Sequence, residues 1–162
     1  IIKNQRKSRK LQTNELRIMQ PSYNLTLSIE NEPSSQDVDF VNNALRQYNL
    51  LYAPADNYQP LQIFLRSEEG TILGGLLGET YWGWLHISIL WIDQSVRKQG
   101  YGRQMLQKAE QEATRRGCHA VHLDTMSFQA LPFYERLGYT IFGTLNDLPA
   151  GHKRIFLMKT LP

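Results

Sequence analysis

The chain has 162 residues, enough for one domain with a sizeable core. Its apolar share of 41% and charged share of 20% are typical of a globular protein, and no apolar run approaches the ~18 residues of a membrane-spanning helix. A single cysteine excludes an internal disulfide and a cysteine-rich metal site. We therefore expect a cytoplasmic protein that does not act in a membrane.

The net charge of +3 is unevenly distributed along the chain. Residues 1–20 contain six basic residues and one acid, whereas the remainder has 12 basic and 14 acidic residues. We expect residues 1–20 to form a basic extension that is flexible or non-native, with the native start at or near Met19 and the domain at 21–162. The alternative, a nucleic-acid-binding arm, is the weakest interpretation because no aromatic residues interleave with the charges. We expect no nucleic-acid partner.

The first half of the chain alternates between strand and helix patterns. Residues 25–29 alternate apolar and polar side chains, which predicts a half-buried strand. Ser34 and Ser35 are suited to cap a helix that runs to about Asn49. A loop is predicted over 52–60.

Three strands are predicted next, followed by an amphipathic helix. Strands at 61–67 and 71–80 are joined by the hairpin signal Glu68-Glu69-Gly70, and a third strand covers 84–93. The helix after Gly100 places one apolar stripe inward and is stopped by Gly117. The residues of that stripe are Met105, Leu106, Ala109 and Ala113.

The remaining elements are a strand at 120–125, a short helix at 129–137, and strands at 139–143 and 153–159. The order of elements predicts a single α/β domain of the mixed, α+β-like kind. We expect a twisted mixed sheet of about six to seven strands, flanked by helices.

The start of the helix at Gly100 is predicted to bind phosphate. In Arg97-x-x-Gly100-x-Gly102, two residues without a Cβ allow an anion to approach the backbone. The first helical turn has unpaired N–H groups, and the helix dipole favours negative charge there. Arg97, Lys98 and Arg103 add positive side chains. No dinucleotide fingerprint or P-loop is present.

With the segment "SFQALPFYERLGY" that follows the next strand, this region resembles the GNAT superfamily of acyl-CoA-dependent N-acetyltransferases. The resemblance covers about 25–161 and is sharpest over 85–142. It implies that the strands at 85–93 and 120–125 are parallel neighbours that splay apart. It also implies that acetyl-CoA binds in the splay, with its pyrophosphate on the amides of 98–103 and its pantetheine along 90–92. The implied contact residues are Leu90, Trp91, Ile92, Arg97, Lys98, Gln99, Gly100, Tyr101, Gly102, Arg103, Ser127 and Tyr134.

Acetyl transfer needs a base for the amine, stabilisation of an oxyanion and a proton donor for the thiolate. The resemblance implies that Tyr134 is the proton donor, although this tyrosine could equally be a core aromatic. The Asn that usually contacts the cofactor in the family is replaced here by Ser127, whose hydroxyl has a shorter reach.

Two residues compete for the base. Period-two alternation places His86 on one face with Ser88, Leu90 and Ile92, and a neutral histidine is a suitable base near pH 7. Asp124, at the end of the next strand, matches a position where other relatives carry an acid. The structural interpretation of His86 is a hydrogen-bonded residue of the sheet, and that of Asp124 is a helix-entry or loop-capping acid. A water chain without a single base is a third alternative for the mechanism. Glu79 is a lesser candidate, for holding a cationic amine.

The sequence thus favours direct transfer of acetyl from acetyl-CoA to a primary amine of a small molecule or peptide. The alternative is a non-catalytic acyl-CoA-binding sensor or regulatory module. We predict no metal site, because the histidines share no ligand spacing. Dimers are common in the family, so a homodimer is compatible with the resemblance, but no residue indicates one.

Overall fold

The computed structural model describes residues 24–162, in which three α-helices, one 3-10 turn and six strands occur. Contacts divide the chain between Asn43 and Ala44, so each unit is described by itself. The basic segment 1–20 and the expected start at Met19 lie outside the described residues. None of the described helices is long and apolar enough to cross a membrane.

Helix α1 (Ser35–Asn49) confirms the first predicted helix. The Ser34 hydroxyl accepts a hydrogen bond from the Asp37 amide at 3.1 Å, as an N-cap does. The strand predicted at 25–29 is wrong: residues 24–30 form no strand, and Leu25, Leu27 and Ile29 are exposed. Alternation alone does not make a strand, because the backbone also needs a partner ladder, and no described strand pairs with this segment.

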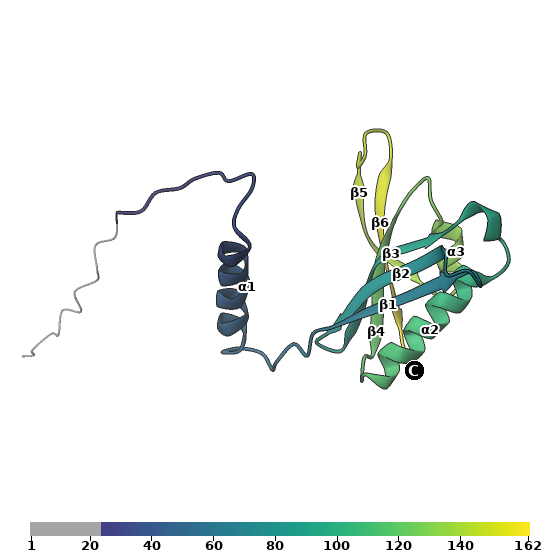
Figure 1. The fold of residues 1–162 in the computed structure, drawn as a ribbon, viewed down its shortest axis with the longest axis horizontal. Coiled ribbons are helices and arrows are strands. Elements are labelled where there is room, and N and C mark those ends of the chain that lie inside the picture. Colours follow the sequence, from purple (N-terminus) through teal and green to yellow (C-terminus); the bar gives the residue numbers. More distant parts are fainter. Residues whose placement is uncertain (1–23) are drawn as a thin grey trace, which may run out of the picture. The chain divides into compact units, whose positions relative to one another are not determined.

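The six strands form one mixed sheet in the order β1-β2-β3-β4-β6-β5, consistent with the predicted six to seven (Figure 1). Antiparallel pairs join β1 (Gln59–Arg66), β2 (Ile72–Tyr81) and β3 (Trp84–Ile92). β4 (Ala120–Met126) is parallel to β3. The hairpin of β5 (Thr140–Asn146) and β6 (Lys153–Thr160) completes the sheet.

Two boundaries differ from the prediction for local reasons. Helix α3 (Leu131–Glu135) is shorter than 129–137, because the Gln129 side chain accepts the Met126 amide at 2.8 Å and so belongs to the preceding turn. Strand β5 extends beyond 143 through a bulge between Ile141 and Gly143, which preserves its pairing with β6.

Helix α2 (Tyr101–Arg115) covers one face of the sheet (Figure 1). Its buried residues are the four of the predicted stripe, Met105, Leu106, Ala109 and Ala113. They pack against apolar side chains that alternate along the strands, such as Leu76, Leu85, Val121 and Leu157, all of which are fully buried. Apolar burial of this kind is the main source of the fold's stability.

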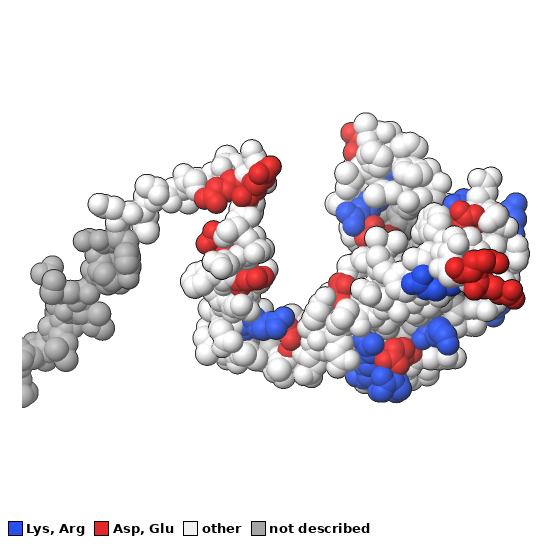
Figure 2. All heavy atoms as spheres, in the orientation of Figure 1, with Lys and Arg blue, Asp and Glu red and all other residues white. Residues whose placement is uncertain are grey.

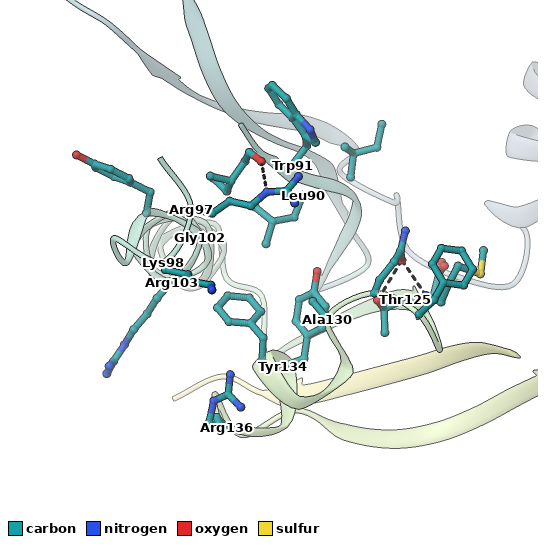
Figure 3. A pocket seen from close by; sticks show the side chains of 18 of the residues that line it. Leu90, Trp91, Arg97, Lys98, Gly102, Arg103, Thr125, Ala130, Tyr134 and Arg136 are labelled. Carbon is teal, nitrogen blue, oxygen red and sulfur yellow. Dashed lines mark hydrogen bonds between the residues drawn. The ribbon is translucent and has the colours of Figure 1, made fainter. Parts of the chain in front are cut away.

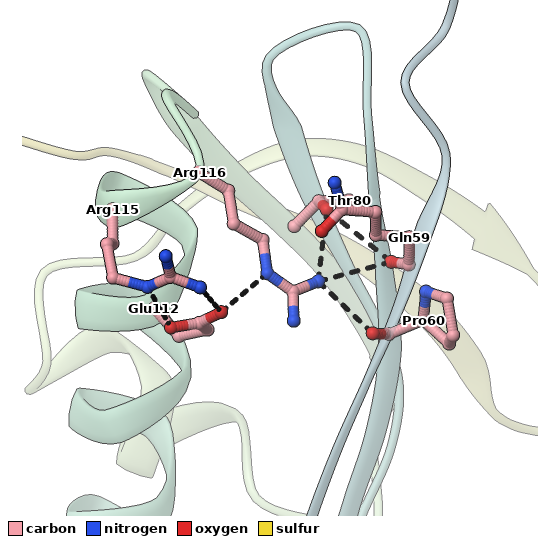
Figure 4. Close-up of polar contacts among 6 residues, drawn as sticks. All are labelled: Gln59, Pro60, Thr80, Glu112, Arg115 and Arg116. Atoms are coloured by element: carbon pink, nitrogen blue, oxygen red, sulfur yellow. Dashed lines mark hydrogen bonds and ion pairs between the residues drawn. The ribbon is translucent and has the colours of Figure 1, made fainter.

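The C-terminal end of α2 is fixed to the sheet by Arg116 (Figure 4). Its guanidinium donates to the carbonyls of Gln59 and Pro60 and to the Thr80 hydroxyl, at 3.1–3.4 Å. Its Nε donates to Glu112 at 2.7 Å. Hydrogen bonds from Arg115 and Arg116 lower the pKa of Glu112 to about 2. The helix is thereby held at the end opposite to Gly100 and the predicted phosphate-binding turn.

An extra residue interrupts the pairing of β2 with β3. Leu77 lies opposite Ile89 and Gly78 opposite Ile87, which leaves Ser88 as a bulge. A Cβ on Gly78 would collide with the backbone carbonyl of His86. Only glycine therefore allows the two backbones to approach this closely.

Replacing Gly78 with alanine should consequently push β2 from β3 at the bulge. We expect Gly78→Ala to lower the free energy of unfolding by about 1–3 kcal/mol, as overpacking does, measured by thermal or urea denaturation. Gly75→Ala is the matched control on the same strand, because its Cβ would meet Phe64 at an ordinary 3.7 Å. Equal stability of the two variants would contradict the close-approach argument.

Candidate acetyl-CoA site

A cleft of about 1080 Å³ opens where β3 and β4 separate. The parallel ladder between them runs only from Trp84↔Ala120 to Ile87↔Leu123, although both strands continue. Residues 89–92 remain paired with β2 on one edge, so their other edge presents free backbone groups to the gap. An extended chain with amide groups can bind such an edge as an added strand would. The predicted parallel and splayed strands are thus confirmed.

The bulge at Ser88 corrects the predicted face of β3. Before it, Leu85 and Ile87 point into the core, and after it Leu90 and Ile92 pack against the same core. His86 therefore lies on the opposite face from Leu90 and Ile92, because the extra residue shifts the alternation by one. The prediction that all three share one face is wrong.

The N-terminus of α2 forms one end of the cleft (Figure 3). Lys98 and Gly100 adopt left-handed conformations, with φ of 62° and 87°, a backbone pattern that gathers N–H groups into an anion-binding concavity. Gly100 caps the helix without a side-chain acceptor, so the first-turn amides are left for a ligand. Arg97 donates from Nε to the Ile92 carbonyl at 2.8 Å, which fixes the turn between β3 and α2.

Other parts of the cleft are apolar or carry single polar groups. Phe133 of α3 lies against Gly102, where a Cβ would sit 3.4 Å from its ring. The cleft is lined by Ser88, Ile89, Leu90, Trp91, Ile92, Val96, Arg97, Lys98, Gly100, Tyr101, Gly102, Arg103, Asp124, Thr125, Met126, Phe128, Gln129, Ala130, Phe133, Tyr134, Arg136 and Arg154. The free strand edge, the apolar wall and the cationic turn fit an acyl-CoA in its pantetheine, thioester and pyrophosphate parts, respectively.

Ten of the twelve predicted contact residues line the cleft. The other two, Gln99 and Ser127, do not. The Gln99 amide donates to the Ser95 carbonyl at 3.4 Å, and the Ser127 hydroxyl accepts the Lys153 amide at 3.1 Å, which joins the loop after β4 to β6. Their side-chain contacts with the cofactor remain predictions that this geometry does not favour.

Tyr134 rises from α3 and points its hydroxyl into the cleft (Figure 3). The residue is buried, and its ring packs edge-on against Phe133 and Tyr139. Burial, with a smaller contribution from the negative charge of Asp124, raises the pKa of Tyr134 to about 12. The phenol therefore keeps its proton at neutral pH.

The two candidate bases occupy different environments. Asp124 lines the cleft, but both of its oxygens accept hydrogen bonds from Arg154, at 2.7 Å each. His86 does not line the cleft and lies in the last pair but one of the β3–β4 ladder, with Nδ1 2.7 Å from Glu79. The sequence did not indicate Arg154 or Arg136 as cleft residues. Arg154 reaches the cleft through the register of β6 with β4, which has no local sequence signal, whereas Arg136 stands at the C-terminal end of α3.

Nucleophilic and metal-binding side chains were also sought in the described residues. Cys118 is buried in the core, where burial raises the pKa of its thiol, which makes it a poor nucleophile. Within residues 24–162, no three His, Cys, Asp or Glu side chains are arranged to hold a metal ion.

The surface charges of residues 44–162 are mixed. Figure 2 shows positive and negative side chains interspersed over the visible face of this part of the chain.

Comparison with known proteins agrees with this geometry. The sequence model of the acetyltransferase (GNAT) family matches residues 25–139. An acetyltransferase from Agrobacterium fabrum is 36% identical over 119 residues, covering 74% of this chain and 87% of the relative. Blasticidin-S acetyltransferase from Streptomyces morookaense is 35% identical over 112 residues, covering 67% and 82%.

Solved structures support the same assignment. A crystal structure of an acetyltransferase from Bacillus cereus has a TM-score of 0.74 and 37% identity, covering 83% of this chain and 98% of that chain. One from Agrobacterium tumefaciens has a TM-score of 0.79 and 31% identity, covering 85% and 100%. The fold and the site together define an acyl-CoA N-acyltransferase. The chain belongs to the GNAT family of acetyltransferases, and its acetyl donor is acetyl-CoA.

The pyrophosphate-binding turn can be tested at Gly102. Replacing it with valine should bring a branched side chain against Phe133 and into the space over the first-turn amides. We expect Gly102→Val to weaken acetyl-CoA binding at least about tenfold, or ~1.4 kcal/mol, measured by isothermal titration calorimetry. Gln111→Ala, at an exposed position further along α2, should bind normally. Unchanged affinity in Gly102→Val would show that the phosphates bind elsewhere.

Proposed function

We propose that the protein transfers the acetyl group of acetyl-CoA directly to a primary amine of a small molecule or peptide. The observation that carries the proposal is the buried Tyr134 at the cleft; burial raises the pKa of its hydroxyl to about 12. The similarity to blasticidin-S acetyltransferase favours a small-molecule acceptor. The acetyltransferase relatives argue against the alternative of a non-catalytic acyl-CoA sensor.

In the proposed reaction, the amine nitrogen attacks the thioester carbonyl carbon. A C–N bond forms, the C–S bond breaks, and the amine gives up one proton while the departing sulfur takes one. A backbone N–H of residues 90–92, on the free edge of β3, polarises the carbonyl oxygen. Tyr134 protonates the sulfur of CoA.

His86 is the favoured acceptor of the amine proton. It lies beside the point where β3 and β4 separate, and a neutral imidazole takes up a proton near pH 7. Asp124 is the weaker candidate, because Arg154 engages both of its carboxylate oxygens and stabilises its charged form. The ion pair between Asp124 and Arg154 instead forms part of the cleft wall.

The cytoplasmic location, the homodimer and the domain limits 21–162 remain predictions from the sequence.

Replacing Tyr134 with phenylalanine tests the proton donor. We expect Tyr134→Phe to lower kcat by about 10²-fold, the usual contribution of a general acid, while acetyl-CoA binding stays unchanged. The assay measures CoA release with a panel of amines, aminoglycosides and peptide N-termini. Tyr139→Phe is the control: this neighbouring buried phenol bonds to Glu110 and does not line the cleft. Unaltered turnover in Tyr134→Phe would remove this residue from the mechanism.

A further inference from the structure

A group of polar side chains lies on the sheet face opposite α2, and most of it has no part in the chemistry described above. Glu79, His86 and His122 come from β2, β3 and β4, where they stand directly opposite one another in the register. Tyr81 and Trp84 border them on the same sheet. Three adjacent strands thus bring one carboxylate and two imidazoles together.

The contacts among these side chains are direct. Glu79 Oε1 is 2.7 Å from His86 Nδ1, and both side chains are about three-quarters buried, with exposures of 26% and 28%. The His86 ring stacks on that of His122, with centroids 4.6 Å apart and planes 13° apart. The Tyr81 hydroxyl lies 3.4 Å from His122 Nε2. Stacking on His122 therefore fixes the plane of the His86 ring, and the contact with Glu79 fixes the direction of its Nδ1.

The group adjoins the inner end of the cleft. The pair His86↔His122 directly precedes Ile87↔Leu123, where the β3–β4 ladder ends. Asp124 follows His122 by two residues, so it lies on the same face of β4, and it lines the cleft. His86 therefore lies one residue from the end of the β3–β4 ladder, where the gap begins.

A carboxylate determines which nitrogen of a neutral histidine carries the proton. An ionised carboxylate only accepts hydrogen bonds, so the contact with Glu79 requires a hydrogen on Nδ1. The other nitrogen, Nε2, then has a free lone pair. Burial, and to a smaller extent the neighbouring His86, lowers the pKa of His122.

We infer that Glu79 is a positioning residue that keeps the His86 proton on Nδ1 and leaves Nε2 free to accept the proton of the amine. This inference rests on the proposed role of His86 as the base. Glu79 itself touches no substrate: it acts through the imidazole, as the carboxylate of a hydrolase triad orients its histidine. The interpretation of Glu79 as a contact for a cationic amine is replaced by this one.

The test uses Glu79→Gln, which keeps the size of the side chain and removes its charge. Because an amide can donate to Nδ1 as well as accept from it, we expect the Nε2–H form of His86 to become populated. Nitrogen-15 NMR of histidine-labelled protein, above the pH at which the ring is protonated, reports the tautomer directly. We expect the Nδ1–H form in the wild type and a mixture in the variant.

The same variant is then assayed for turnover. We expect kcat to fall at least about tenfold, less than the roughly 10⁴-fold loss that follows such a change in a fully buried triad, with the KM for acetyl-CoA unchanged. Tyr81→Phe is the matched control, since it removes the hydroxyl beside His122 and leaves the Glu79–His86 contact. It should keep both the tautomer and the rate.

The outcomes separate this inference from the proposed function. An Nε2–H tautomer in the wild type, or the same tautomer and rate in Glu79→Gln, would overturn the positioning role. His86→Gln tests the base itself. Full turnover in His86→Gln, together with a changed His86 tautomer in Glu79→Gln, would overturn the catalytic role of both residues and leave acetyl transfer to be assigned to another base.

Discussion

The β3–β4 ladder stops at Ile87 and Leu123, and the function of the protein depends on that interruption. A bulge at Ser88, allowed by the missing side chain of Gly78, changes the alternation of β3 at the first residue beyond that ladder. The freed edge provides backbone groups for an extended acyl chain, and the loop after β3 carries the chain directly to the anion-binding turn of α2. The end of the β3–β4 ladder thus leaves both the space and the free backbone groups of the cleft.

The side chains proposed to donate and to accept protons lie near the end of the β3–β4 ladder, and their environments differ. Tyr134 is buried, so its phenol stays protonated and available as a donor. His86, on the opposite face of the sheet, is partly accessible and contacts a carboxylate. Asp124 is held by Arg154 between these two regions. Tyr134 packs with the core on the α2 side of the sheet, so the proposed donor and the proposed acceptor of protons lie on opposite sides of it.

Local patterns predicted local structure well. The spacing of Met105, Leu106, Ala109 and Ala113 identified the buried stripe of α2, and Gly100 marked the start of that helix. The splay was expected from the family resemblance. Features that depend on pairing between distant segments were not predictable in this way. The extra residue at Ser88 reverses the face of Leu90 without any local sign, and Arg154 reaches Asp124 only through the register of β6 with β4. For the same reason, the alternating residues 25–29 resembled a strand that has no partner in the described structure.

The central claim, that acetyl-CoA binds along the free edge of β3 and on the first turn of α2, is tested most directly by amide hydrogen exchange. Addition of acetyl-CoA should slow exchange both at 98–103 and at those amides of 88–92 that face the gap, while β1, on the far side of β2 in the sheet, remains unchanged. Protection at 98–103 without any at 88–92 would mean that the acyl chain does not occupy the splay. Absence of protection in both segments would contradict the account as a whole.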